Sequence, residues 1–328
     1  MYQISLEDKE GLEQYLLNRQ ALDGGEKLEH LEIAGHGNMN MVLRVKTNSR
    51  SFVLKQSRPY VQKYPSVLAP VARIEVEHEF YRQMEKAKAW QTKKPQIFWF
   101  DKEHHILCME DLGVSSDFTD IYRKEVDVTK AEIAELTKII SELHTVPLKG
   151  PSIQNVEMKR LNHSHIFELP LVVNNGFDLN SVVSGLHEGT EKFRGNARLQ
   201  QCANNLGNIY LNGGGEKLLH GDFYPGSWLR TKDGIKIIDP EFCFHGKPEF
   251  ELGVMIAHLK LAQQTSGLMK DLFVYYHFDS RFDGSLFTKF AGMEMIRRLI
   301  GLAQLPLDLT LKERLDMLDE AYELVIHG

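Results

Sequence analysis

The stretch that most constrains this chain is Leu218–Phe244, LLHGDFYPGSWLRTKDGIKIIDPEFCF, because it holds a hairpin with acidic residues at both ends. Two short apolar runs, Trp228–Arg230 and Ile235–Ile238, are predicted to be strands. The turn between them, Lys232–Gly234, contains Asp-Gly, which is a strong hairpin signal. An antiparallel hairpin returns the chain to the level at which it started. We therefore expect the residues just before the first strand and just after the second to lie close together.

Three carboxylates flank this hairpin: Asp222 in a His-Gly-Asp loop before it, and Asp239 and Glu241 in an Asp-Pro-Glu sequence after it. Phosphoryl transfer needs one carboxylate to orient and deprotonate the acceptor hydroxyl, and others to hold magnesium on the nucleotide phosphates. Asp222 fits the first role, and Asp239 with Glu241 fits the second. Each short motif alone is equally typical of an ordinary turn or strand end. Their order around one hairpin favours a catalytic and metal-binding cluster.

The sequences HGDFYPGSW and IIDPEF resemble the catalytic loop and metal motif of the aminoglycoside phosphotransferase and choline kinase superfamily, the small-molecule relatives of protein kinases. The resemblance is strongest to the methylthioribose kinases, which also carry Ser at the position of Ser227. It implies an α+β, two-lobed, protein-kinase-like fold, with an antiparallel-sheet lobe over residues 1–110 and a mostly helical lobe over residues 111–328. It also implies ATP and Mg²⁺ as cofactors, with Ser227 as a further, weaker metal ligand.

The loop Ile33–Asn40, which is rich in Gly and Asn, is a candidate phosphate-binding loop. Gly35 and Gly37 can take positive φ and let backbone N–H groups approach a phosphate closely. A plain hairpin turn is the commoner meaning of such a pattern. The resemblance implies that Asn38 and Asn40 belong to the nucleotide-binding loop as well.

Three strands are predicted around this loop: Leu28–Ile33, Met41–Thr47 and Ser51–Gln56. The third strand carries Lys55, at the place where kinases put a lysine on the nucleotide phosphates. Without that context, Lys55 would be an ordinary solvated strand lysine. The strand and the preceding loop together favour a nucleotide site.

A helix rich in glutamate is predicted over Val71–Ala87. Glu75 and Glu79 share one face by their i,i+4 spacing, whereas Glu77 points elsewhere. The ion pair of the kinase fold, carried over by resemblance, makes Glu77 the predicted partner of Lys55. Glu75 is the alternative partner, and a solvated acidic face is the alternative role for the glutamates that do not pair.

Two further strands, Ile97–Phe100 and His105–Met109, are predicted to form an edge hairpin. The second runs directly into acidic residues and glycine, Glu110-Asp111-Leu112-Gly113. The resemblance implies that this is the hinge between the lobes. Backbone groups of Met109, Glu110 and Leu112 would then pair with adenine.

From residue 129 onward the pattern changes from strands to helices. The predicted helices besides Val71–Ala87 are Leu6–Gln20, Ala131–His144, Glu191–Asn212, Phe250–Ala262 and Leu286–Leu302. The segments Gln62–Pro70 and Asn155–Pro170 are predicted to be irregular. In Leu6–Gln20, one packing face is predicted to consist of Leu12, Tyr15, Leu16 and Leu17.

The last of these helices carries adjacent arginines, Arg297 and Arg298. Neighbouring helical residues point about 100° apart, so such a pair usually has one solvated and one packed member. The sequence IRRLIGLAQ, however, resembles the twin-arginine stretch of the methylthioribose kinases, which faces the active site. A guanidinium there can counter the charge of the transferring phosphoryl group or clamp acceptor hydroxyls. The resemblance also places Glu251 where relatives brace the catalytic loop.

Composition excludes several classes of function. A net charge of −6 and a pI near 6.2 argue against a nucleic-acid-binding surface. Cys108, Cys202 and Cys243 are scattered in apolar contexts, so we expect buried free thiols in a reducing compartment. The N-terminus lacks an apolar stretch and no run of about 18 apolar residues occurs, which predicts a soluble, cytoplasmic protein.

The sequence therefore predicts an ATP- and magnesium-dependent kinase of a small-molecule hydroxyl, with Asp222, Arg297 and Arg298 as catalytic residues. A methylthioribose-like sugar is the first acceptor, and an aminoglycoside, an amino alcohol such as choline or another sugar is the alternative. A catalytically impaired, nucleotide-binding pseudokinase is the alternative from another class, because Ser227 replaces the usual Asn. We expect no nucleic-acid or membrane partner, and leave open whether the chain is a monomer or a homodimer.

Overall fold

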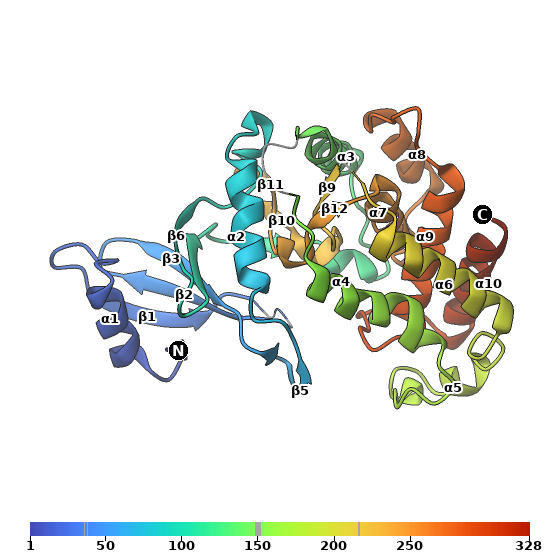
Figure 1. Cartoon of the computed structure of the whole chain (residues 1–328), viewed down its shortest axis with the longest axis horizontal. Helices are drawn as coiled ribbons and strands as arrows, with labels where there is room; N and C mark the ends of the chain where they lie inside the picture. Colours follow the sequence, from blue (N-terminus) through green and yellow to red (C-terminus); the bar gives the residue numbers. More distant parts are fainter. Residues whose placement is uncertain (36, 38, 148–151, 216) are drawn as a thin grey trace. The chain divides into compact units, whose positions relative to one another are not determined.

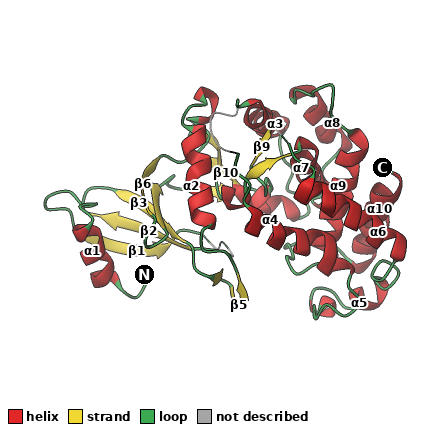
Figure 2. Ribbon diagram, viewed as in Figure 1, coloured by secondary structure: helices red, strands yellow, loops and turns green. Residues whose placement is uncertain are grey.

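The N-terminal strands lie where the sequence predicts them. In the computed structural model, which describes residues 1–35, 37, 39–147, 152–215 and 217–328, these strands form one antiparallel sheet of order β1-β2-β3-β7-β6 (Figure 2). Its strands are β1 (Leu28–Ile33), β2 (Met41–Thr47), β3 (Ser51–Gln56), β6 (Ile97–Asp101) and β7 (Ile106–Glu110).

The chain divides into two units, and the division is not a single cut. Figure 1 labels the helices and strands of both units. The first unit combines Met1–Ser115 with the short segment Lys236–Glu241, and the second combines Ser116–Ile235 with Phe242–Gly328. Asp239 and Glu241 therefore belong to the first unit, whereas Asp222 belongs to the second. The expected proximity of these carboxylates concerns two separate units and stays a prediction.

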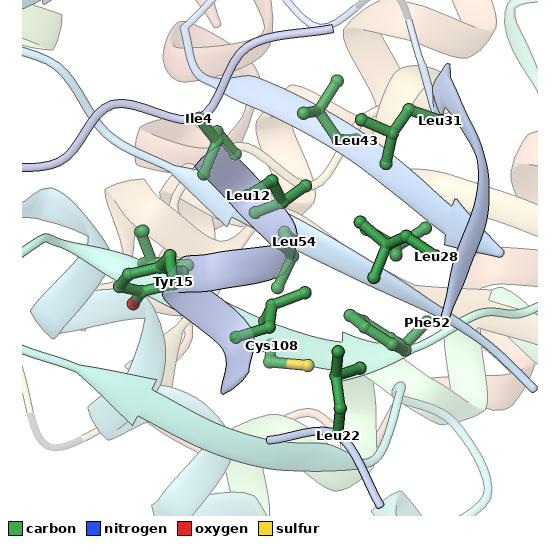
Figure 3. Packing of buried hydrophobic residues seen from close by; sticks show 13 residues of the cluster. Ile4, Leu12, Tyr15, Leu22, Leu28, Leu31, Leu43, Phe52, Leu54 and Cys108 are labelled. Carbon is green, nitrogen blue, oxygen red and sulfur yellow. The ribbon is translucent and has the colours of Figure 1, made fainter. Parts of the chain in front are cut away.

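One face of the first unit's sheet is covered by α1 (Lys9–Asn18), which begins after the N-cap Asp8. Successive strand residues point to opposite faces, and Phe52 and Leu54 of β3 point towards this helix. They pack there with Leu12 and other buried residues of one apolar cluster (Figure 3). The prediction that Leu17 shares this face is wrong: its side chain is exposed, because its position turns it away from the cluster.

The other face of β3 carries Lys55, and α2 (Arg73–Met84) brings a carboxylate to it. The segment Gln62–Pro70, predicted to be irregular, instead contributes most of a small hairpin, β4 (Tyr60–Val61) and β5 (Tyr64–Leu68). Pro65 lies within β5, and a proline in a short strand obscures the strand pattern in the sequence.

The second unit is mainly helical, with short two- to four-residue strands beside the helices. Thr129 caps α3 through a capping box with Glu132. Its helices are α3 (Lys130–Thr145), α4 (Val156–His163), α5 (Leu186–Gly189), α6 (Ala197–Asn212), α7 (Pro248–Leu261), α8 (Ser266–Tyr275), α9 (Gly284–Ile300) and α10 (Leu311–His327). Its short strands are β8 (Ser116–Asp117), β9 (Lys217–Leu219), β10 (Trp228–Thr231) and β12 (Phe244–Gly246). Strand β11 (Gly234–Ile237) begins in the second unit and ends in the first.

Two predictions about these helices are wrong. The stretch Asn155–Pro170 is not irregular: it holds α4, a π-helical turn over Ser164–Glu168 and the start of a 3₁₀ turn. The helix predicted from Glu191 begins only at Ala197, because the side chain of Asn196 caps it by accepting from the N–H of Leu199. Helices α8 and α10 were not predicted.

Helices α7 and α9 form the centre of the second unit, and nearly every residue of both is buried. Gly253 permits their close approach, since a Cβ there would lie 2.9 Å from Cβ of Phe290. Among the described helices, none is long and apolar enough to cross a membrane. Cys108 and Cys243 are buried free thiols as predicted, whereas Cys202 is only partly buried, because it lies on the partly solvated side of α6.

Candidate active site

The first group of predicted site residues meets at Lys55. Its Nζ lies 2.6 Å from Oε2 of Glu77 and 2.6 Å from Oδ1 of Asp239. The structure thus brings Glu77 to the lysine, whereas Glu75 pairs with Lys102 at 2.9 Å. Lys55 and Glu77 are almost completely buried, and Asp239 is 42% exposed. The cluster therefore has one carboxylate that reaches solvent.

The charges in this cluster are set by burial and by one another. Burial alone would lower the pKa of Lys55, but the carboxylates of Asp239, Glu77 and Glu241 raise it above its usual value. Burial raises the pKa of Glu77 to about 7, although Lys55 opposes this shift. Oε1 of Glu77 is buried and has no hydrogen-bond partner among the described residues. Lys55 is consequently a fixed cation beside a carboxylate that is only partly satisfied.

Asp239 has φ +62°, in the left-handed region that non-glycine residues seldom occupy. Asp is among the few residues that tolerate it. The neighbouring Pro240 begins a short 3₁₀ turn that carries Glu241. This backbone shape directs the two carboxylates, two residues apart, to different partners.

Glu241 is buried and faces residues that the sequence did not link to it. Its Oε2 accepts a hydrogen bond from Nδ2 of Asn40 at 2.9 Å and lies 3.1 Å from Nε of Arg73. Burial raises the pKa of Glu241, while Lys55 and Arg73 act in the opposite direction. One oxygen of this predicted metal ligand is therefore already engaged by the protein.

The predicted phosphate-binding loop is open where the structure describes it. Gly35 does not have the positive φ that the sequence allowed, and an added Cβ on Gly35 or on Gly37 would meet nothing within 4 Å. Asn38 lies outside the described residues. Asn40 is buried with its amide turned towards Glu241.

The predicted hinge begins at the end of β7. Met109 pairs with Val53 across the sheet, and the backbone N–H of Glu110 donates to the carbonyl oxygen of Gln96 at 2.8 Å. The strand ends at Glu110, so Leu112 lies beyond it, half-buried. Of the predicted adenine-binding residues, Leu112 is the one outside the regular sheet.

The loop that carries Asp222 is held by hydrogen bonds from its backbone to Glu251 of α7. This fully buried carboxylate accepts hydrogen bonds from the backbone N–H groups of His220, at 3.1 Å, and Gly221, at 2.7 Å. Its Oε2 also lies 2.9 Å from Nε2 of His144 on α3. Gly221 has φ +85°, and a Cβ there would lie 2.1 Å from the carbonyl oxygen of Phe242, so only glycine fits. The loop conformation is therefore fixed by buried groups.

Immediately after Gly221, the loop turns tightly at Asp222. The backbone N–H of Tyr224 donates to the carbonyl oxygen of Asp222 at 3.1 Å, and Oγ of Ser227 donates to the same oxygen at 2.9 Å. Ser227 is buried, whereas the carboxylate of Asp222 is 19% exposed. The turn thus presents the Asp222 carboxylate towards solvent and keeps the Ser227 hydroxyl inside.

The twin arginines lie on the same side as the Asp222 carboxylate. Nη2 of Arg298 is 3.4 Å from Oδ1 of Asp222, and Nη1 of Arg297 is 4.0 Å from the same oxygen. The guanidinium of Arg298 also lies over the ring of Tyr224, with 4.9 Å between its carbon and the ring centroid. Both arginines are buried, contrary to the usual pattern of one packed and one solvated member.

Glu294, one turn earlier on α9, balances the charge of this pair. It contacts Nη1 of Arg297 at 3.0 Å and Nε of Arg298 at 2.6 Å. Although burial opposes ionisation, the two guanidinium groups hold the pKa of Glu294 well below its usual value. Nε of Arg297 is buried without a hydrogen-bond partner among the described residues. The pair therefore keeps an unsatisfied donor.

His258 of α7 completes this network as a neutral group. Its Nε2 lies 3.1 Å from Oε1 of Glu294, and its Nδ1 lies 2.5 Å from the hydroxyl of Tyr122. Burial lowers the pKa of His258 to about 4, with Arg298 acting in the same direction and Glu294 opposing it.

This shift predicts a pH dependence of stability. The unfolded chain takes up a proton at His258 near pH 6.5, whereas the folded protein does so only near pH 4, so His258 should destabilise the fold progressively as pH falls through this window. The expected loss is on the order of 3 kcal/mol at the low end. The free energy of unfolding, measured with urea at several pH values between 4 and 7, should have a shallower slope against pH in His258→Gln than in the wild type. Equal slopes would contradict the prediction, and His30→Gln, at an exposed histidine, is the control.

Glu294 and Arg73 are among the residues of these clusters to which the sequence did not point. Glu294 precedes Arg297 and Arg298 by three and four positions, a spacing that could have identified it as their partner. Arg73 carries no such local signal, because its partners Asn40 and Glu241 are distant in the chain.

The predicted metal residues fit a hard cation in part. Carboxylate and hydroxyl oxygens are ligands that magnesium accepts. Among the predicted ligands, Asp239 is 42% exposed, whereas Glu241 is 6% exposed and the buried Ser227 hydroxyl is held inside its loop. In the part of the chain that the structure describes, no three His, Cys, Asp or Glu side chains form a metal site by themselves. Asp239 is therefore the predicted metal ligand whose carboxylate is most accessible.

The chain is similar to known phosphotransferases. A sequence model described as the phosphotransferase enzyme family matches residues 30–283. A methylthioribose kinase from Exiguobacterium sibiricum is 27% identical to this chain, in an alignment that covers 86% of this chain and 82% of that protein. A methylthioribose kinase from Bacillus velezensis is 30% identical, and the alignment covers 69% of this chain but only 59% of that protein.

Among solved structures, the spectinomycin phosphotransferase APH(9)-Ia, in complex with ADP and spectinomycin, is similar with a TM-score of 0.56. The match covers 97% of both chains at 11% sequence identity. Identity at this level concerns the fold, and it confirms the predicted α+β architecture with an antiparallel sheet followed by a helical part.

Proposed function

Because the chain belongs to the phosphotransferase enzyme family, we propose that it transfers the γ-phosphoryl group of ATP to a hydroxyl of a small, sugar-like molecule. The observation that carries this proposal is the buried Lys55, held between Glu77 and the solvent-reaching Asp239. A fixed cation beside an accessible carboxylate is suited to phosphate and to its metal ion.

The first unit supplies the nucleotide side of this chemistry. Lys55 is placed to neutralise phosphate charge, and Glu77 keeps its ammonium in position. The open loop at Gly35 and Gly37 leaves room for a phosphate against the backbone. Magnesium, when bound, would draw charge from the phosphate oxygens, and Asp239 is the residue of this unit that we propose to hold it, with Glu241 as a lesser contributor.

The second unit supplies the acceptor side. Asp222 orients the acceptor hydroxyl and takes up its proton, on a loop that Glu251 holds rigid. Arg297 and Arg298 lie beside that carboxylate, and the unpartnered Nε of Arg297 is a donor for an oxygen of the acceptor or of the phosphoryl group. Positioning and charge neutralisation thus account for the expected catalysis.

A methylthioribose-like sugar is the acceptor that the sequence relatives favour, since two curated relatives carry that name. The buried arginine pair also suits an acceptor with several oxygens, because a planar guanidinium can bond two oxygens at once. An aminoglycoside or an amino alcohol is the second candidate. The ammonium group of such an acceptor would need carboxylates or aromatic faces near Asp222, and Glu294, one carboxylate of this region, is already bound to two guanidinium groups.

A thermal-shift and activity screen tests the proposal. The protein is melted with Mg·ATP, and then assayed with methylthioribose, other sugars, aminoglycosides and amino alcohols. A ligand at about 100 times its Kd stabilises the fold by about 2.7 kcal/mol, which is readily detected. No stabilisation by Mg·ATP would refute the function, and stabilisation without turnover of any acceptor would favour the pseudokinase.

The metal assignment predicts the behaviour of Asp239→Ala. This change should abolish the extra stabilisation that magnesium gives to the ATP-bound protein, because it removes the accessible carboxylate. Calorimetric titration of ATP with and without magnesium measures the effect. Asp233→Asn, in the exposed hairpin turn, should behave as the wild type. Unchanged magnesium dependence in Asp239→Ala would exclude it as the ligand.

A further inference from the structure

Arg73 uses its whole guanidinium group inside the first unit, where its side chain has no exposed surface. Nη1 donates to the carbonyl oxygens of Arg58, at 2.7 Å, and Pro70, at 2.8 Å. Nη2 donates to the carbonyl oxygens of Met39, at 2.8 Å, and Tyr60, at 3.4 Å. Five N–H donors in a rigid plane can satisfy so many acceptors only in one arrangement. The guanidinium therefore fixes separate backbone segments relative to one another.

The remaining donor, Nε, faces two side chains at once. It donates to Oδ1 of Asn40 at 3.0 Å and lies 3.1 Å from Oε2 of Glu241. Asn40 in turn donates from Nδ2 to that same oxygen of Glu241 at 2.9 Å. Two hydrogen bonds and the Arg73–Glu241 ion pair thus link Arg73, Asn40 and Glu241 in a closed triangle. Both ends of the Asn40 amide are occupied within it.

This triangle joins two segments that are expected to serve the nucleotide. Met39 and Asn40 end the glycine-containing loop, and Glu241 lies two residues after Asp239. The triangle is buried, since Asn40 is 6% exposed and Glu241 is 5% exposed. Arg73 has no surface with which to touch a ligand, so any influence on nucleotide binding must act through these neighbours.

We propose that Arg73 is a positioning residue that locks the end of the glycine-containing loop to the segment carrying Asp239, and so sets the geometry in which the first unit receives the phosphates and metal of the nucleotide. This inference rests on the proposed function. It assigns Asn40 and Glu241 a shared task in holding the loop, in addition to any direct contact with ligand.

The test is Arg73→Lys, with Arg82→Lys as the matched control. Arg82 lies on the same helix, is 49% exposed and pairs only locally with Glu79. A lysine keeps the charge at position 73 but cannot bond Asn40, Glu241 and the four carbonyl oxygens together. We expect affinity for Mg·ADP, measured by calorimetry, to fall by about tenfold or more, as found when groups supporting a binding site are changed. The KM for ATP should rise equally, while the KM for the acceptor stays unchanged.

Wild-type affinity in a folded Arg73→Lys protein would overturn the inference, whereas a wild-type protein that fails to bind nucleotide would overturn the proposed function instead. If Arg73→Lys does not fold, Asn40→Ala, Glu241→Gln and the double variant decide the matter. A shared task predicts that the losses of Mg·ADP affinity in the single variants are not additive in the double variant. Additive losses of affinity, or no loss in either single variant, would refute the proposed positioning role.

Discussion

Asp222→Asn is expected to lower kcat by about 100- to 10,000-fold, the range associated with loss of a positioned general base. The substitution keeps the size and shape of the side chain but removes the carboxylate that accepts the proton of the acceptor hydroxyl. The loop should keep its conformation, because it is held through backbone N–H groups of His220 and Gly221 and through the carbonyl oxygen of Asp222. The fold and nucleotide affinity should therefore stay near the wild type.

Steady-state kinetics with the best acceptor, together with calorimetric titration of Mg·ATP, check both parts. Asp233→Asn provides the same chemical change at an exposed turn of the neighbouring hairpin and should leave kcat unchanged. A wild-type rate in Asp222→Asn would show that another group serves as the base. A joint loss of rate and of nucleotide affinity would instead indicate a disturbed fold.

Glu294→Gln should destabilise the protein by about 3–5 kcal/mol, the usual result of removing one partner from a buried ion pair. Glu294 is the carboxylate that contacts both Arg297 and Arg298, and all three side chains are buried. A neutral amide would leave two buried guanidinium groups with Asp222 as the remaining nearby carboxylate. Asp222 would then be drawn into a structural ion pair, so kcat should also fall.

Urea unfolding above pH 6 measures the stability change, because Glu294 is fully ionised there in the wild type. Glu323→Gln on α10, where the side chain is 64% exposed, is the control and should change stability by less than about 0.5 kcal/mol. A change of similar size in both variants would mean that the arginines are not held by Glu294. Below the usual pKa of a glutamate the difference should shrink, since the unfolded chain then takes up a proton that folded Glu294 does not.

Much of the fold could be predicted because local patterns decide it. The alternation in Ser51–Gln56 sends Lys55 to one face and Leu54 to the other, and the structure has the strand with those bounds. The helix predicted over Ala131–His144 from its apolar period is likewise present, as α3. The β4–β5 hairpin and α4 were missed, since a proline and a cluster of polar residues there obscure the period on which such predictions depend.

The candidate site likewise contains residues that could be predicted from the sequence and residues that could not. Resemblance to kinases singled out Lys55 and Glu77, and the structure brings their charged groups together. The roles of the predicted site residues stay proposals until the variants are measured. Arg73 could not be found from its neighbours in the sequence, because its partners are set by tertiary structure: Asn40 is 33 residues away, and Glu241 returns to the first unit only after the chain has formed most of the second.

The return of Lys236–Glu241 to the first unit also has a consequence for how the protein is made. Until the ribosome has produced residue 241, Arg73 and Lys55 lack the carboxylates of Glu241 and Asp239. The nascent N-terminal part would then carry a buried guanidinium without its counter-ion, which is costly in an apolar interior. A truncated chain ending at Ser115 should for this reason be less stable than the same unit with the segment 236–241 in place. Completion of the N-terminal unit is thereby delayed until more than two thirds of the protein has been synthesised.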